Sequence, residues 1–282
     1  MNTASELVSR VTDLVSFPDV AIQVNDLLAD DLSDADAIGA IIEQDPALTA
    51  NLLKLANSAM YGSATEIDTV SKAFTRIGSR EIQELTFGIC ASRAFAGIPN
   101  EIVSVEDFWH HSLLCGTAAR LLAQRTRCQN ASMVFTAGLL HDIGHLVMFH
   151  LIPEESLRTL ALCRNEMNAE DLHIAERELL GFDHTDVGRA LGERWNWPSA
   201  LINCIARHHE PFEYPDCTDA EITIHLANSV ATLAEIGSND FDDAPPVDER
   251  TWDRLGLQPD EVLEILDQTR EDISSLLQIF SH

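Results

Sequence analysis

The sequence predicts an all-α protein, and three observations support this fold class. Apolar residues recur at three- and four-residue spacing along almost all of the 282 residues, which is the pattern of amphipathic helices. Alternating apolar and polar runs, which would predict strands, are nearly absent. Gly and Pro number only 13 and 10, and they are sparse inside the periodic segments. A chain of this length is sufficient for one large domain or two modest ones.

Six helices are expected in the first part of the chain. The first stops before Phe17-Pro18, because the residue that precedes a proline is disfavoured in the helical region. Asp45-Pro46 opens the fourth, with proline at its favoured first position, and Gly62 is a natural stop for it. The expected helices cover residues 3–15, 20–28, 33–42 (capped by Ser33 and Asp34), 45–61, 70–77 and 79–94.

A break at Gly97-Ile-Pro-Asn100 is interpreted as the boundary between two helical subdomains. After it, Ser104 to Asp107 forms a capping-box-like start, and one central helix is expected from Ala131 to Phe149. Further helices are expected over residues 170–180, 198–209, 219–235 and 259–280. One more helix is expected to begin at Asp183. The expected domains are an N-terminal helical subdomain (1–99), a second helical subdomain (100–237), and an acidic linker with a C-terminal helix packed on the body (238–282).

Charge and targeting signals narrow the function. The chain carries 46 acidic and 18 basic residues, a net charge of −28, which disfavours nucleic acid or an anionic membrane as a partner. The start has no basic and apolar leader, and no uncharged run reaches about 18 residues. None of the six cysteines forms C-x-x-C, as expected for free thiols in a reducing compartment. We therefore expect a cytoplasmic protein with an acidic linker, Asp242 to Pro246, that is a flexible connector.

Histidines and one carboxylate form the candidate functional constellation. The apolar segment Ala137 to His145 contains a His-Asp doublet, and a lone buried charge usually requires a partner or a metal. Other histidines lie on separate expected helices, which can converge on one polar pocket. Imidazole and carboxylate together suit zinc, iron, manganese or nickel. The residues concerned are His111, His141, Asp142, His184, His208 and His209.

Several motifs together resemble the HDOD family, the "HD-related output domain", over about residues 5–237. The histidines and the doublet also resemble the wider HD superfamily of metal-dependent phosphohydrolases and its HD-GYP branch, which hydrolyses cyclic di-GMP. The motifs that carry the HDOD resemblance are Asp45-Pro-Ala-Leu-Thr49, Leu55-Ala-Asn-Ser58, Thr75-Arg-Ile-Gly78, Trp195-Asn-Trp-Pro198 and His225-Leu-Ala-Asn228.

The resemblance implies a fold and a ligand set. The fold is a bundle of N-terminal helices joined to an HD-like bundle. In active HD enzymes a histidine matching His111 binds a first metal with the doublet and a later aspartate, where this chain has Asn228. In two-metal members the doublet aspartate bridges to a second ion, held by histidines matching His184, His208 and His209. Such ions would neutralise phosphate oxygens and activate water.

Two departures count against hydrolase chemistry. His145 stands where cyclic di-GMP hydrolases usually have lysine, and the Gly-Tyr-Pro triplet is missing, with only Tyr214-Pro215 after the His208-His209 pair. Because Asn228 is a neutral ligand, a single ion is expected on the His184 side, with occupancy falling below the ordinary histidine pKa of about 6.5. A hydrogen-bonded remnant without metal is the other interpretation of the doublet.

Two functions follow from the resemblance. The first is a bacterial signal-transduction output module that acts through protein contacts, with a pocket for one or two divalent ions (Zn, Ni, Fe or Mn) or a small phosphorylated ligand. The alternative is a metal-dependent phosphohydrolase acting on a nucleotide or cyclic dinucleotide, with Asp142 as its catalytic candidate. The expected partners are signalling proteins, and a homodimer is compatible with either function.

Overall fold

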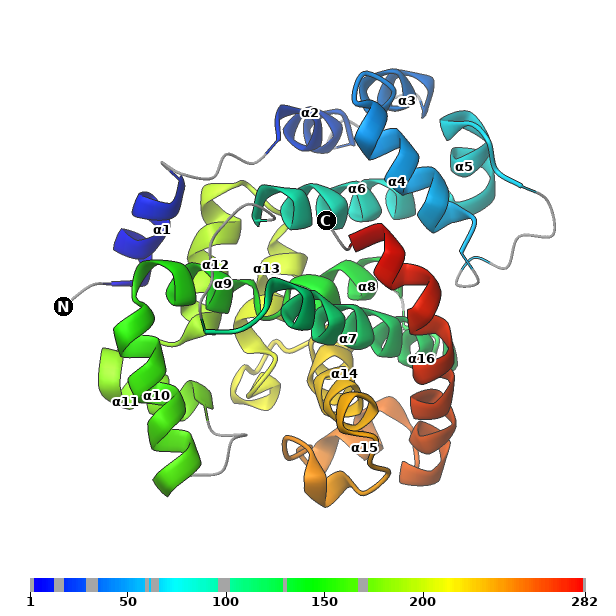
Figure 1. Ribbon diagram of the computed structural model, residues 1–282. Helices are drawn as coiled ribbons and strands as arrows, with labels where there is room; N and C mark the ends of the chain where they lie inside the picture. The colour runs from blue at the N-terminus through cyan, green and yellow to red at the C-terminus, as the bar shows by residue number, and fades with distance from the viewer. Residues whose placement is uncertain are drawn as a thin grey trace. The chain divides into compact units, whose positions relative to one another are not determined.

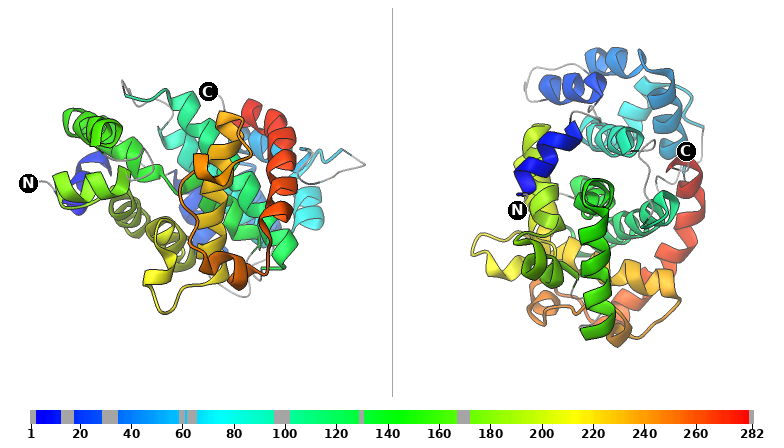
Figure 2. Two further views of the ribbon diagram at one scale, coloured as in Figure 1. Left: turned by 90° about the horizontal axis from the view of Figure 1, so that it is seen from below. Right: turned by 60° about the vertical axis from the view of Figure 1, so that its left-hand side comes forward.

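The computed structural model describes residues 3–12, 18–28, 35–58, 61, 66–95, 102–128, 131–166 and 172–280 (Figures 1 and 2). Across these ranges the chain forms helices joined by turns, and no β-strand occurs among them, which confirms the all-α prediction. Four expected features lie outside the described residues: the stop of the first helix before Phe17-Pro18, the Ser33-Asp34 cap, the stop at Gly62, and the subdomain boundary at residues 97–100.

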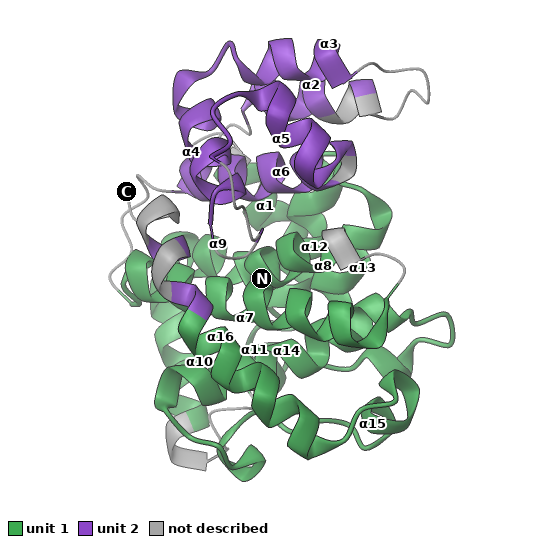
Figure 3. Cartoon of the chain, turned by 90° about the vertical axis from the view of Figure 1, so that its right-hand side faces the viewer, with its two compact units in different colours: residues 1–15, 98–271 green, residues 16–97, 272–282 purple. Residues whose placement is uncertain are grey.

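The chain divides into two compact units (Figure 3). The first comprises Met1–Val15 with Ile98–Glu271, so the first helix is grouped with the second half of the chain. The second comprises Ser16–Gly97 with Asp272–His282. Every candidate site residue falls within the first unit.

The second unit is a helical bundle in which side chains cap the ends of helix α4 (Pro46–Ala56). Asp45 accepts hydrogen bonds from the backbone N–H groups of Ala47 and Leu48 and forms an ion pair with Arg93 at 2.8 Å. Asn57 ties the end of its helix to Ile67, because its side chain donates to the Ile67 carbonyl and accepts from the Ile67 N–H. The helices are α2 (Asp19–Leu28), α3 (Ala35–Ile42), α4 (Pro46–Ala56), α5 (Val70–Ile77) and α6 (Ser79–Phe95).

The first unit is built around α7 (Val105–Thr126), which packs on α8 and α14 (Figure 2). Ser104 caps α7 by accepting from the Asp107 N–H, as its sequence predicts. The remaining helices are α1 (Ala4–Thr12), α8 (Ala131–Leu140), α9 (Ile143–Leu151), α10 (Pro153–Glu166), α11 (Leu172–Leu180), α12 (His184–Arg194), α13 (Ser199–Arg207), α14 (Asp219–Ile236), α15 (Arg250–Leu255) and the start of α16 (Pro259–Phe280).

Glycines allow the helices of this unit to approach one another closely. A Cβ on Gly138 would lie 2.7 Å from the Cα of Gly116, so only glycine permits this crossing of α8 and α7. A Cβ on Gly144 would lie 1.9 Å from the carbonyl oxygen of His184, so α9 contacts the start of α12 backbone to backbone. The second contact places the His-Asp doublet beside His184.

The expected central helix from Ala131 to Phe149 is two helices, so the prediction of one continuous helix is wrong. The chain turns at His141 and Asp142, between the end of α8 and the start of α9. Consecutive residues of an α-helix point about 100° apart, and the turn instead allows both side chains to face one centre. The apolar window Met133–Leu151 has the length and hydropathy of a membrane span, but 83% of it is buried in the structure, as core segments are.

The acidic segment after α14 is folded against the helix, in contrast to the expected flexible connector. It contains a short 3₁₀ helix, η4 (Phe241–Asp243), and the hydroxyl of Ser229 donates to the carbonyl of Pro245. Ala244 is buried. The short helix α15, which the sequence pattern did not predict, follows this segment.

Candidate metal centre

Asp142 is the centre of a cluster of imidazole nitrogens. Its Oδ2 lies 3.2 Å from Nε2 of His141, and its Oδ1 lies 3.3 Å from Nε2 of His184 and 3.5 Å from Nε2 of His208. The Nε2 atoms of His209 and His184 are 3.0 Å apart. Four residues, Asp142, His184, His208 and His209, thus offer ligand atoms that all lie within 4.8 Å of one another.

A second group shares Asp142 with His111 and His141, again with ligand atoms within 4.8 Å. Asn228 completes this side, because its Oδ1 lies 3.1 Å from Nε2 of His111. The other nitrogen of His111, Nδ1, lies 3.1 Å from the carboxylate of Glu235. The structure therefore brings together all the side chains that the sequence proposes for the site, drawn from α7, the α8–α9 turn, α12, the end of α13 and α14.

Hydrogen bonds orient the imidazole rings of this cluster. Nδ1 of His141 donates to the Gly138 carbonyl at 2.7 Å, and Nδ1 of His208 donates to the Ile205 carbonyl at 2.9 Å. These bonds leave the lone pairs of both Nε2 atoms directed at the cluster. Both Nε2 atoms are buried and have no hydrogen-bond partner among the described residues. Orphaned buried nitrogens beside a carboxylate are what a divalent ion would satisfy, so the donor set fits a metal.

The charges of the cluster shift the pKa values of its members in opposite directions. Burial alone would raise the pKa of Asp142, but His141 and His184 outweigh burial and hold that pKa well below its usual range. Burial alone would lower the pKa of His184, but Glu176 and Asp142 outweigh it and raise that pKa to about 10. Burial and the charges of neighbouring histidines lower the pKa of His208 and His209 well below 6.5. Burial alone would lower the pKa of His141, but Asp142 outweighs it and raises that pKa well above its usual range. Without an ion, His141 and His184 are therefore both protonated at neutral pH, whereas His208 and His209 are neutral.

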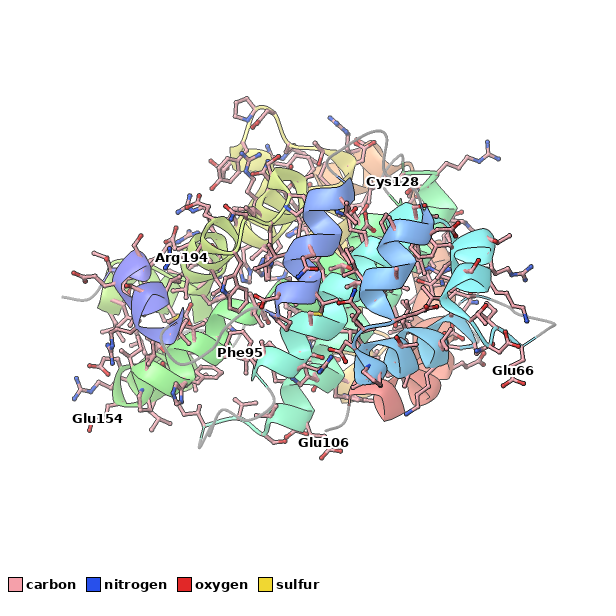
Figure 4. All side chains as sticks on the ribbon, turned by 90° about the horizontal axis from the view of Figure 1, so that it is seen from above. Glu66, Phe95, Glu106, Cys128, Glu154 and Arg194 are labelled. Carbon is pink, nitrogen blue, oxygen red and sulfur yellow. The ribbon has the colours of Figure 1, made fainter. Side chains whose placement is uncertain are left out.

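Sequence reasoning missed two carboxylates that contact histidines of the site, Glu176 and Glu235. Glu176 lies on α11, is 1% exposed, and accepts from Nδ1 of His184 at 2.7 Å and from Nε2 of His145 at 3.1 Å. Most acidic side chains lie at the surface, as Glu66, Glu106 and Glu154 do (Figure 4). A signal was available for Glu176, because it follows His173 and Ala175 on the buried face of α11.

Two other motifs have structural roles. His225 donates from Nδ1 to the carbonyl of His208 and accepts at Nε2 from the Asp248 N–H, so both its nitrogens are satisfied. Trp195 and Trp197 are 8% and 4% exposed, with ring centroids 5.7 Å apart, so they pack in the core. None of these three side chains offers a free ligand atom to the centre.

Comparison with known proteins identifies the family of the chain. A family model described as the HDOD domain matches residues 14–211. A protein of Treponema pallidum (strain Nichols), described as uncharacterized, is 30% identical over 216 residues, which is 75% of this chain and 41% of that protein. The chain thus spans less than half the length of that relative.

Solved structures share the fold. An HDOD domain protein of unknown function from Geobacter sulfurreducens has a TM-score of 0.70 at 25% identity, covering 98% of this chain and 96% of its own. A candidate phosphohydrolase from Shewanella amazonensis SB2B has a TM-score of 0.78 at 21% identity, covering 97% of both chains. A candidate signal transduction protein from Marinobacter aquaeolei VT8 has a TM-score of 0.73 at 22% identity, covering 96% of this chain and 61% of its own.

Proposed function

Because the chain belongs to the HDOD family, we propose that it is a bacterial signalling output module that acts through protein contacts and whose HD-like centre holds one divalent ion. The observation that carries the proposal is the asymmetry of the two ligand groups around Asp142. One group offers a carboxylate and three imidazoles. The other places the neutral amide of Asn228 where active HD enzymes, by the resemblance, have a second carboxylate.

The ion is assigned to Asp142, His184, His208 and His209. One carboxylate and three neutral imidazoles are a complete set for zinc, nickel, iron or manganese. On the other side, His111 is held between Asn228 and Glu235 by contacts of 3.1 Å at each ring nitrogen. Nε2 of His111 is therefore already occupied by a hydrogen-bonding contact, which disfavours a second ion there.

A single ion would support only weak catalysis or none. A pair of ions would clamp and polarise a phosphate from both sides, whereas one ion in a closed ligand set supplies fold stability and at most Lewis acidity. In this function the module binds cytoplasmic signalling proteins. A second copy of the chain, forming a homodimer, is one such partner. The net charge of −28 disfavours nucleic acid and anionic membranes in that role.

The second candidate is a metal-dependent phosphohydrolase acting on a nucleotide or cyclic dinucleotide. The complete ligand group around Asp142 favours it, since the side chains needed for one hydrolytic ion are all present. In that case Asp142 would be the metal-holding catalytic residue. The fold shared with the candidate phosphohydrolase of Shewanella amazonensis is consistent with either function, because a shared fold does not determine chemistry.

The test is metal content combined with a hydrolysis screen on the full chain, purified without a histidine tag. Wild type supplied with zinc, nickel, iron or manganese should retain close to one ion per chain, and His208→Ala should retain far less. Hydrolysis of p-nitrophenyl phosphate, nucleotides and cyclic di-GMP should stay at background for wild type.

A matched variant separates the two candidates. Asn228→Asp restores the carboxylate and should raise the metal content toward two ions, with weak hydrolysis as its consequence. Turnover of a phosphate ester by wild type would favour the phosphohydrolase. Wild type that binds no metal under saturating supply, or His208→Ala that retains its full content, would refute the metal centre.

A further inference from the structure

Glu176 is a fully buried carboxylate that the ligand set of the proposed centre does not use. It lies on α11, and its side chain is 1% exposed. A buried charge is expensive unless it is paired and hydrogen-bonded, so a carboxylate in this position requires specific partners. Those partners are two histidines of the cluster, His145 on α9 and His184 on α12.

The two oxygens of Glu176 receive three N–H groups. Oε2 accepts from the backbone N–H of His184 at 3.0 Å and from its ring Nδ1 at 2.7 Å. Oε1 accepts from Nε2 of His145 at 3.1 Å. Because a carboxylate is acceptor-only, both ring nitrogens that face it must carry their protons. The Nδ1 position of His184 is thereby fixed as a donor, and its Nε2 is the atom left for a ligand.

The contacts also fix where His184 points. Its Nε2 faces Oδ1 of Asp142 at 3.3 Å, on the opposite side of the ring from Glu176. The rings of His184 and His145 are stacked with centroids 3.9 Å apart, so Glu176 holds the two rings as one unit. Carboxylate–histidine–metal arrangements of this type raise the basicity of the ligand nitrogen and set its orientation.

We infer that Glu176 is the positioning residue of the metal centre: it holds Nε2 of His184 toward the ion and supplies the second negative charge that Asn228 does not. This inference rests on the proposed function, since it concerns the same ion. The charge of Glu176 reaches the ion through the imidazole of His184 rather than by direct contact. Asp142 and Glu176 together thus supply two negative charges to one ion, although only Asp142 is a direct ligand. By the resemblance, active HD sites supply two negative charges through two carboxylates that both bind metal directly.

Zinc affinity of the metal-free full-length protein, measured by competition with a chromophoric chelator, tests the inference. The isosteric Glu176→Gln should weaken zinc binding by about 10- to 100-fold, the usual effect of removing such a hydrogen-bonded carboxylate. Glu178→Gln is the matched control, because Glu178 is exposed on the same helix, and it should bind zinc as wild type does. Far-UV circular dichroism of each variant establishes that the helices are intact.

A second readout does not require metal. In nitrogen-edited proton spectra of the metal-free protein, the Nδ1 proton of His184 should give a downfield, slowly exchanging resonance, because it is buried against a carboxylate. Glu176→Ala should lose this resonance, whereas Glu178→Gln should retain it. A structural role of Glu176 in helix packing alone would leave both zinc affinity and this proton unchanged.

The outcomes distinguish this inference from the function on which it rests. Wild type that binds zinc together with Glu176→Gln that binds it equally well overturns the inference alone, as does a wild-type Nδ1 resonance that survives in Glu176→Ala. Wild type that binds no zinc overturns the metal centre and the inference with it.

Discussion

Gly144→Ala tests whether the close contact of α9 with α12 holds the cluster in place. The added Cβ would lie 1.9 Å from the carbonyl oxygen of His184, 2.8 Å from its carbonyl carbon and 3.0 Å from the backbone nitrogen of Gly188. Ordinary carbon contacts begin near 3.4 Å, so the two backbones must separate by about 1.5 Å. Overpacking that side chains can absorb costs about 1–3 kcal/mol, and here the contacted atoms are backbone.

The expected loss in unfolding free energy is therefore about 3 kcal/mol or more, equivalent to roughly 10 °C in melting temperature for a unit of this size. Thermal denaturation followed by circular dichroism measures it. The control is Gly39→Ala, whose Cβ would meet only Val70 and Phe74 at 3.7 and 3.8 Å. This control lies inside α3 and should be neutral or more stable by about 0.5–1 kcal/mol.

Zinc affinity of the same variant links packing to the site. Separation of the backbones moves His184 away from Asp142, so Gly144→Ala should also bind zinc more weakly than wild type. A Gly144→Ala protein that melts at the wild-type temperature and binds zinc normally would refute the reasoning.

Two further predictions concern pH and capping. Because the raised pKa of His184, about 10, means that zinc must displace its proton, zinc affinity should rise about tenfold per pH unit between pH 6 and 8. Chelator competition at each pH measures this, and an affinity that levels off just above pH 6.5 would contradict it. Asp45→Ala removes a helix cap and an ion pair with Arg93, so it should lower the unfolding free energy by about 1–2 kcal/mol. Urea denaturation measures the change, and a midpoint equal to that of wild type would contradict the capping role.

Local signals in the sequence were sufficient to predict much of the fold. Asp45, Ser104 and Asp183 each cap the helix that they precede, because capping depends on residues only two or three positions away. The histidines were expected to converge from separate helices on one pocket, and the structure brings their ligand atoms together. Helices α10 and α15 were missed: the first carries charged residues on much of its surface, and the second has only six residues.

The parts that escaped prediction depend on contacts between distant residues. Glu176 meets His145 across 31 residues of sequence, and no local periodicity encodes such a pairing. The turn at His141-Asp142 was missed because the flanking residues are continuously apolar, a pattern that one long buried helix would share. The linker near Pro245 was expected to be flexible from its composition, but Ser229 holds it through a hydrogen bond that composition cannot reveal.

The two hydrogen bonds of His225 connect the loop after α14 to the end of α13, beside the candidate metal centre. One bond holds the backbone carbonyl of His208, and the other receives the amide hydrogen of Asp248. Exchange of that amide with deuterated solvent requires the imidazole of His225 to release it, which is easiest when the end of α13 is free to move. An ion bound to His208 would restrain that movement, so we expect the amide of Asp248 to exchange more slowly when the centre holds an ion.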